Sequence, residues 1–441
     1  MLPVLLAASP AAAPLLRPQE VRALPGRLDG VLMLNDNNPE LISGPGILLS
    51  TFGGSGHLDV PLNGRFDLFS HHVYAGTPEQ PDSTIWLAVV AQPRGDQPVQ
   101  LSLLSGSTAL SQATDGREAQ APFLPLPERM RQDGSTYAGP GSRVATELLL
   151  RQRNPDLPKR WTLAPGAPTT LLLLPIPVQG LDPLLNGRNL QLRLQASGPI
   201  SVATLAAFGE GNKPPSTAAL QQLLASGVLS PKEHKPTPRG ARGRMVYSRV
   251  SGVQVGSTWS AVITDPGQPC LSSTSAPLSW PIASLERGTL GTAQVQTAEL
   301  KAHYPGTAWA AHGNYGVAYD IRIPLCNRSK RSTELAVALE SPLKTDQAIG
   351  GLRFNSSPSR SVMFRGTVEL SGLDGDASRQ SFHLVQRAGA QGPELGRIRL
   401  AAGGKRELRV RLIYPADATP PQVLSLLPVK QSPAPPDSLQ P

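Results

Sequence analysis

Charged and aromatic residues are scarce in this sequence. Of its 441 residues, 17% are charged and 5% are aromatic, whereas Pro (46 residues) and Gly (42 residues) are abundant. Such a charge content is low for a cytosolic enzyme, and Pro and Gly scattered without a collagen-like period are typical of turns between short strands. The chain also lacks an apolar run of about 20 residues, so we expect no transmembrane span.

The motifs of several enzyme classes are missing as well. There is no CxxC pair, HExxH motif or dinucleotide-binding fingerprint, and the Gly-rich loop around Ser55 lacks the Lys of a phosphate-binding loop. Ser55, His57 and Asp59 supply the residue types of a hydrolase triad without its G-x-S-x-G pattern. His71 and His72 are adjacent, and neighbouring strand residues point to opposite faces, so they cannot readily share one metal ion. We therefore expect no catalytic residues, no metal site and no cofactor.

Two polar turns offer oxygen atoms that could bind Ca²⁺. They are NDNNPE at 35–40 and DGD at 374–376. Neither turn has the full spacing of a calcium loop, and ordinary turn chemistry explains both.

Cysteine is nearly absent, since the chain contains only Cys270 and Cys326. A disulfide between them would close a loop of 56 residues. The chain-entropy model gives such a loop roughly 3 to 4 kcal/mol of stabilisation. A disulfide would require an oxidising compartment, and two buried free thiols are the alternative.

The strongest pattern is a repeat. Residues 84–105 and 319–341 both contain an apolar run, a polar turn and a second run of alternating apolar residues, so that Val99 corresponds to Leu335 at an offset of 236. A second landmark, Leu-Ala-Pro-Gly in one half and Leu-Ala-Ala-Gly in the other, recurs at an offset of 237. We expect one β unit that is present twice, with each pair of runs forming a hairpin.

Many short strands with a turn signal about every ten residues indicate an all-β protein. We expect two tandem Ig-like β-sandwich domains joined by a linker that contains one short helix. The segments are a signal peptide at 1–16, a first domain at 17–209, the linker at 210–244, a second domain at 245–427 and a disordered tail at 428–441.

The linker carries the signals of a helix. Ser216 can cap its N-terminus, and Gly227 can end it after residues 217–226. The basic, Pro-rich stretch at 231–240 predicts an extended spacer between the two domains.

The first 16 residues are apolar and contain small residues between Ala7 and Ala13. Ala11 and Ala13 match an A-x-A cleavage signature, although the stretch has no basic segment before it. We expect a signal peptide whose start lies upstream of Met1, and hence a periplasmic, extracellular or cell-surface protein.

Four segments resemble an uncharacterised cyanobacterial family that is known as a domain of unknown function. They are PQEVR at 18–22, LPG at 24–26, GRFDLFSHH at 64–72 and GNYGV at 313–317. The resemblance covers nearly the whole chain and implies an exported, envelope-associated protein. The family has no known activity, so no catalytic residue is transferred.

Aromatic residues gather at 303–319, in a chain that has few of them. Rings that cover sugar faces, next to polar groups that bind hydroxyls, are typical of carbohydrate- or peptide-binding surfaces. The alternative is that these rings fill the second core. The candidate ligand-binding residues are His303, Tyr304, Trp309, His312, Asn314 and Tyr315.

We expect a non-enzymatic exported protein of the cell envelope that binds or structures material such as polysaccharide. The alternative is a carbohydrate-active enzyme, a lyase or hydrolase, that uses His and acidic residues. A deep cleft with paired carboxylates would favour the enzyme, and a shallow aromatic surface would favour the binding protein. The net charge of +9 would suit a nucleic acid only if it gathered on one face, so no nucleic-acid partner is expected.

Overall fold

The computed structural model describes residues 13–429 except 114–118, 153, 212, 274, 358 and 376–378. Within these residues it contains 27 strands and two helices, which confirms a mostly β protein. Most of the expected signal peptide and nearly all of the expected tail lie outside the described residues. In the part that is described, neither helix is long and apolar enough to cross a membrane.

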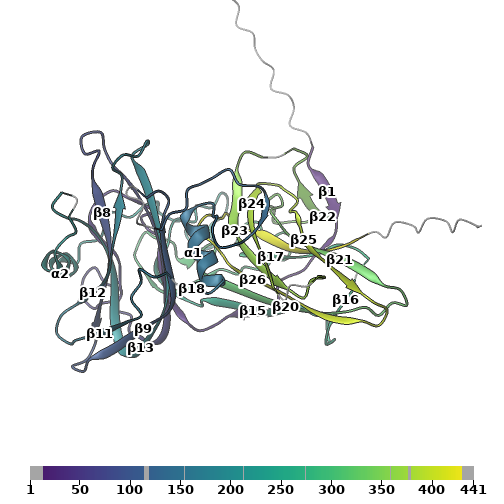
Figure 1. Ribbon diagram of the computed structural model, residues 1–441, viewed down its shortest axis with the longest axis horizontal. Coiled ribbons are helices and arrows are strands. Elements are labelled where there is room, and N and C mark those ends of the chain that lie inside the picture. Colours follow the sequence, from purple (N-terminus) through teal and green to yellow (C-terminus); the bar gives the residue numbers. More distant parts are fainter. Residues whose placement is uncertain are drawn as a thin grey trace, which may run out of the picture.

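The largest sheet system has twelve strands and forms one half of the molecule (Figure 1). Its strands are β4 (Leu32–Asp36), β5 (Leu41–Ile42), β6 (Gly46–Ser50), β7 (Leu62–Ala75), β8 (Thr84–Pro93), β9 (Val99–Leu110), β11 (Arg160–Leu163), β12 (Thr169–Pro177), β13 (Leu185–Phe208), β14 (Ser251–Val255), β18 (Ala298–His303) and β19 (Ala310–Ala311).

The long strand β13 joins two layers of this system. Its first part pairs with β7 and β9, and its last part pairs with β6 and β8. The register shifts between Ala196 and Ile200, where a Ser-Gly-Pro turn interrupts the β7 ladder. Both layers bury apolar side chains, such as Leu68, Leu87 and Leu192, in one shared core.

The second core lies between an eight-stranded and a five-stranded sheet. The eight strands are β3 (Arg27–Leu28), β10 (Arg129–Arg131), β15 (Thr258–Val262), β16 (Leu271–Ser272), β20 (Ala318–Cys326), β23 (Val362–Ser371), β24 (Gln380–Arg387) and β26 (Lys405–Ile413). The five are β2 (Glu20–Val21), β17 (Leu278–Ile282), β21 (Thr333–Glu340), β25 (Glu394–Leu400) and β27 (Gln422–Pro428). Ile321 and Val410 from the first sheet meet Trp280 and Val337 from the second. A separate pair consists of β1 (Leu15–Pro18) and β22 (Gly351–Phe354).

Part of the strand pairing recurs in the two halves, in the order that the predicted duplication requires. In the first half β8 pairs with β12, and β9 pairs with β11 and β13. In the second half β20 pairs with β26, and β21 pairs with β25 and β27. Three pairings among five strands therefore recur in the same chain order, although β8 also pairs with β13 and β20 does not pair with β27 among the described residues. Val99 and Leu335 lie on corresponding strands of this comparison, β9 and β21.

The expected hairpins are wrong. Among the described residues β8 does not pair with β9, and β20 does not pair with β21. The polar turn between each pair instead carries the chain from one layer to the other. Each run then buries its apolar side chains in the same core from opposite sides, which satisfies the same alternating pattern as a hairpin would.

The sheets do not follow the expected boundaries at 209 and 245. β1, β2 and β3 come from the N-terminus and pair with β22, β17 and β15 of the second half. Conversely, β14 and β18 extend the first sheet system beyond β4. Hydrophobic pattern alone could not reveal this exchange, because it shows that a strand is half-buried and not which sheet covers it.

The expected linker helix is confirmed as α2 (Thr217–Ser226). Ser216 Oγ accepts a hydrogen bond from the Ala219 N–H at 3.1 Å, and Gly227 ends the helix in a left-handed conformation with φ 65°. Leu220 and Leu224 of α2 cover the outer face of β6, β8 and β13.

The rest of the linker does not act as a free spacer. Val228 and Ser230 exchange backbone hydrogen bonds with Ile47 at 2.9 and 3.0 Å. Lys232 Nζ donates to the carbonyl oxygens of Asn38 (2.8 Å) and Leu48 (2.5 Å), so this stretch is attached to the first half.

The structure also contains a second helix, α1 (Pro140–Leu149), between β10 and β11, whereas the sequence predicts one helix, in the linker. Its start carries Pro at the first position, which suits a helix N-terminus. Figure 1 shows α1 between the two halves of the molecule, where it contacts β9 and β13 on one side and β23 and β26 on the other.

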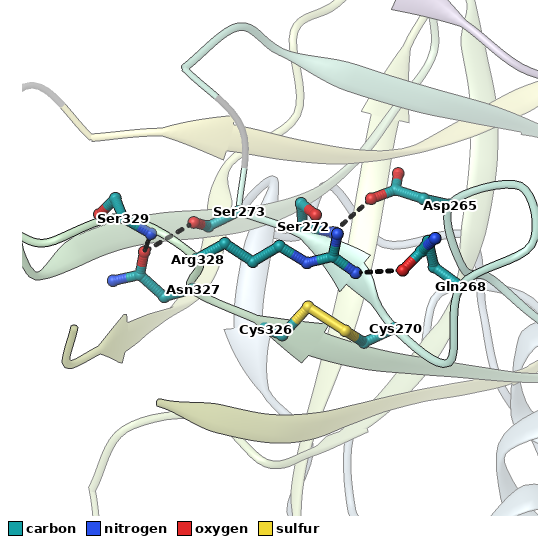
Figure 2. Close-up of a disulfide and its surroundings, with 9 residues drawn as sticks. All are labelled: Asp265, Gln268, Cys270, Ser272, Ser273, Cys326, Asn327, Arg328 and Ser329. Carbon is teal, nitrogen blue, oxygen red and sulfur yellow. Dashed lines mark hydrogen bonds between the residues drawn. A yellow bond between two sulfur atoms is a disulfide. The ribbon is translucent and has the colours of Figure 1, made fainter. Parts of the chain in front are cut away.

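The two cysteines form the expected disulfide (Figure 2). Cys326 ends β20, and Cys270 precedes β16, which pairs with β20 in parallel. Around the disulfide, Arg328 donates to Gln268 Oε1 at 2.6 Å, and the Ser272 N–H donates to Asp265 at 2.9 Å. The bridge therefore fixes one end of the eight-stranded sheet.

Candidate functional site

Three of the six candidate ligand-binding residues, Tyr304, Asn314 and Tyr315, use their polar groups for hydrogen bonds within the protein. Tyr304 is buried, and its hydroxyl donates to Gly56 O at 3.0 Å and accepts from Ser50 N–H at 3.1 Å. Asn314 is buried and donates to Gln296 O at 2.6 Å. Tyr315 donates to Ala418 O at 2.9 Å, and burial raises the pKa of its hydroxyl to about 12. These three side chains hold loops of the fold in place.

The other three residues do not form one continuous surface with them. Trp309 Nε1 donates to Thr237 O at 3.0 Å, and its ring contacts His312 edge-on at 4.7 Å. His312 is buried, and its Nδ1 lies 3.2 Å from Glu286 Oε2. His303 is half-buried, with Nδ1 3.1 Å from Tyr304 O. A ligand-binding role for this segment stays a prediction, and its accessible part is Trp309 with His303.

The residue types of a hydrolase triad are not assembled. His57 Nδ1 lies 2.7 Å from Ser50 Oγ, and Asp59 accepts from Arg94 at 2.9 Å, so neither is bonded to Ser55. The polar turn at 35–40 instead contributes to a buried network, in which Asp36 Oδ2 lies 3.0 Å from His72 Nε2. In the ranges that the structure describes, no three His, Cys, Asp or Glu side chains form a metal-binding group.

A cleft of about 790 Å³ lies at the junction of the two halves. It was not expected from the sequence. We call it the basic cleft, because five cationic side chains line it: Arg151, Lys159, Arg160, Arg193 and Arg411.

Four separate parts of the chain bring these cations together. Arg151 follows the C-terminal end of α1, and Lys159 and Arg160 lead into β11. Arg193 comes from β13 and Arg411 from β26, so both halves contribute. Leu104 on β9 is the extra residue of a β-bulge opposite Arg193 and is 54% exposed at the cleft. Bulges commonly redirect a side chain in this way beside functional sites.

The charge of the cleft is only partly neutralised. Arg193 Nε lies 3.8 Å from Asp67 Oδ2, and this Nε is buried without a hydrogen-bond partner among the described atoms. Burial lowers the pKa of the Arg193 guanidinium group. The negative charge of Asp67 raises this pKa, and the positive charge of Arg411 lowers it further. Arg411 donates to Glu369 at 2.7 Å. Both carboxylates lie behind the cleft, since no Asp, Glu or His is among its described lining residues.

This arrangement suits a ligand with several negative charges. Arg guanidinium groups bind carboxylate, sulfate or phosphate through two parallel hydrogen bonds, and partial burial strengthens those bonds. Ser102, Ser105 and Gln152 add polar groups that could bind hydroxyls, and Leu104 offers an apolar contact. A local sequence signal for this cleft is the basic stretch at 151–160, which contains Arg151, Lys159 and Arg160.

Comparison with known proteins shows the family. Residues 19–428 match the family described as protein of unknown function (DUF3370), and the chain belongs to it. No curated protein matches the chain.

Proposed function

We propose that this member of the DUF3370 family is a non-enzymatic, exported protein of the cell envelope that binds an acidic polysaccharide in its basic cleft. The observation that carries the proposal is the group of five cations around a cleft of about 790 Å³. The volume falls in the range of about 300–1,000 Å³ that ligand pockets usually have. A few charged sugar units would fill it.

A polysaccharide suits the cleft better than a simple ion does. Two of the cations, Lys159 and Arg160, are exposed at its rim, and Arg193 and Arg411 lie deeper. The acidic groups of a chain of uronic or sulfated sugars would contact both the exposed and the deeper cations. Its hydroxyl groups would lie near Ser102 and Gln152. Cations at the rim also speed the approach of a charged polymer.

The proposal extends to export and architecture. A disulfide between Cys270 and Cys326 is what an oxidising compartment such as the periplasm or cell exterior permits, which supports export. The repeated pairing of five strands supports two Ig-like β-sandwich domains in tandem that arose by duplication, with three N-terminal strands added to the second. We also propose the cyanobacterial envelope as its setting, from the segments quoted above.

The carbohydrate-active enzyme has less support. Glycoside hydrolases place two carboxyl groups beside the bond that they cleave. None of the described residues that line the basic cleft is an Asp or a Glu, and Asp67 and Glu369 are engaged by Arg193 and Arg411. We therefore propose binding without cleavage.

The test is salt-dependent binding to alginate and heparin, with neutral dextran as reference. Lys159→Glu with Arg160→Glu reverses two exposed charges at the cleft. Arg242→Glu with Arg244→Glu makes the same change at two exposed linker residues and is the matched control. If each reversed charge costs about 0.5–1 kcal/mol, the cleft variant loses about tenfold in affinity.

The control variant should lose less than about twofold, and dextran should not bind. Equal losses in the two variants would show that only the net charge matters, and the basic cleft would then have no special role. Binding of dextran as tight as that of alginate would equally contradict the proposal.

A further inference from the structure

A second cleft, of about 730 Å³, lies near the other end of α1. We call it the arginine–phenylalanine cleft. Its walls come from the segment 123–128, from β23 and β24, and from the loops at 355–357 and 388–391. None of these elements lines the basic cleft, so the two sites are separate.

One wall of this cleft is apolar and exposed. Phe123 is 54% exposed, and Leu15 and Leu124 are 51% and 42% exposed. Val362 and Val385 extend the same wall. Large apolar side chains that converge on one concavity, instead of being scattered singly, mark a binding site.

The cleft also holds three arginines, Arg360, Arg365 and Arg387, and one carboxyl group, Glu128, so the arginines outnumber the carboxyl group three to one. Burial raises the pKa of Glu128, and the charge of Arg387 opposes this. Arg365 lies over the Phe123 ring, with 5.1 Å between its Cζ and the ring centre. Its Nε is buried and has no hydrogen-bond partner among the described atoms. Arg387 donates to Ser359 O at 2.9 Å, which leaves further donors of its guanidinium group for a ligand.

The negative group behind Arg365 neutralises it incompletely. Asp417 accepts a hydrogen bond from the Ser142 N–H at the start of α1, at 2.8 Å. Burial raises the pKa of Asp417 to about 7, against the opposing effects of this hydrogen bond and of Arg365. An added Cβ at Gly139 would lie 2.5 Å from both Phe123 and Asp417, so only glycine lets the ring and the carboxyl group approach α1.

We propose that the arginine–phenylalanine cleft binds a single-chain amphiphile with an anionic head, such as an alkyl phosphate or a long-chain carboxylate. The alkyl chain lies against Phe123 and Leu124, and the head group accepts hydrogen bonds from Arg365 and Arg387. Charge complementarity sets the orientation, because the arginines lie beside the apolar wall. A neutral sugar would leave the buried Nε of Arg365 without a partner, which disfavours it.

The experiment is titration calorimetry of the full chain with dodecyl phosphate below its micelle concentration. Inorganic phosphate and octyl glucoside supply the head group alone and a neutral amphiphile. We expect one dodecyl phosphate per chain, bound at least tenfold more tightly than either reference compound. A similar affinity for inorganic phosphate would overturn the proposal, and so would a similar affinity for octyl glucoside.

Variants locate the site. Phe123→Ser and Arg387→Gln alter exposed side chains, and each should weaken dodecyl phosphate binding at least fivefold while the melting temperature stays unchanged. Arg160→Gln, in the basic cleft, should bind dodecyl phosphate as the wild type does. Unchanged binding in both Phe123→Ser and Arg387→Gln would refute the site.

A further arm separates free amphiphiles from a lipid surface. Phosphatidylglycerol vesicles should sediment less than a tenth of the protein, because the cleft is sized for one molecule. Sedimentation of most of the protein, with no binding of dodecyl phosphate monomers, would overturn the proposal. None of these measurements depends on the basic cleft, so the polysaccharide proposal stands or fails separately.

Discussion

Removing the disulfide should destabilise the second half of the molecule by about 4 kcal/mol. Cys270 and Cys326 are separated by 56 residues, a loop that contains β16 to β19 and most of β20. In the chain-entropy model, a disulfide that closes a loop of this length restricts the unfolded chain and so stabilises the folded protein by about 4 kcal/mol at 25 °C. Cys270→Ala with Cys326→Ala removes the bridge and leaves no polar atom in these buried positions.

Urea unfolding measured by tryptophan fluorescence reads the effect directly, because Trp259 and Trp280 lie in the second core. With a slope of about 2–3 kcal/mol per M, the unfolding midpoint should fall by roughly 1.5–2 M. The wild-type protein in reducing agent should unfold at the midpoint of the double variant. If reduction leaves the wild-type midpoint unchanged, the bridge does not stabilise the fold and the reasoning is refuted.

Three further changes test individual contacts. Ser216→Ala removes the cap of α2 and should cost about 1 kcal/mol in urea unfolding, whereas Ser216→Asp should cost little; equal losses would contradict the cap. Tyr304→Phe removes the partner of the buried Ser50 N–H and of the partly buried Gly56 carbonyl, so it should cost about 1–3 kcal/mol without changing alginate binding; lost binding in a stable protein would show that Tyr304 contacts the ligand. Asp417 has a raised pKa of about 7, so between roughly pH 4 and 7 the unfolded chain releases a proton that the folded chain keeps, and stability falls as pH rises. Asp417→Asn cannot ionise and should not show this fall. The melting temperature of the variant minus that of the wild type should therefore be larger at pH 8 than at pH 5. An equal difference at the two pH values would contradict the raised pKa of Asp417.

Local signals predicted several parts of this fold correctly. The helix α2 follows from a capping Ser216 and a terminating Gly227, which act within a few residues of the helix. The partial recurrence of strand pairing agrees with the two landmarks at nearly equal offsets, because corresponding strands keep their order along the chain. The two cysteines of the sequence allowed either a disulfide or two free thiols, and the structure shows the disulfide.

Features that depend on long-range pairing could not be predicted in the same way. Strands joined by a short turn were expected to pair, yet β8 and β9 pair with opposite ends of β13. The apolar alternation of a strand is the same whether its neighbour in space is also its neighbour in sequence. For the same reason nothing in β1 to β3 indicates that they join the second half.

The basic cleft shows the same limit for a binding site. Its cations come from the end of α1, the start of β11, β13 and β26. Because 251 residues separate Arg160 from Arg411, no local motif exists. The dense aromatic segment was a clear local signal, but Tyr304 and Asn314 use their polar groups inside the protein. Composition shows which side chains are available, and only the fold shows which ones face a ligand.

The most direct test is the structure of the protein with a bound trisaccharide of guluronate, one of the two uronic acids of alginate. We predict that a sugar carboxylate lies within hydrogen-bonding distance of the guanidinium group of Arg193 or Arg411, with a sugar ring next to Leu104. A trisaccharide bound only elsewhere on the protein, with the basic cleft empty at saturating ligand, would contradict the account.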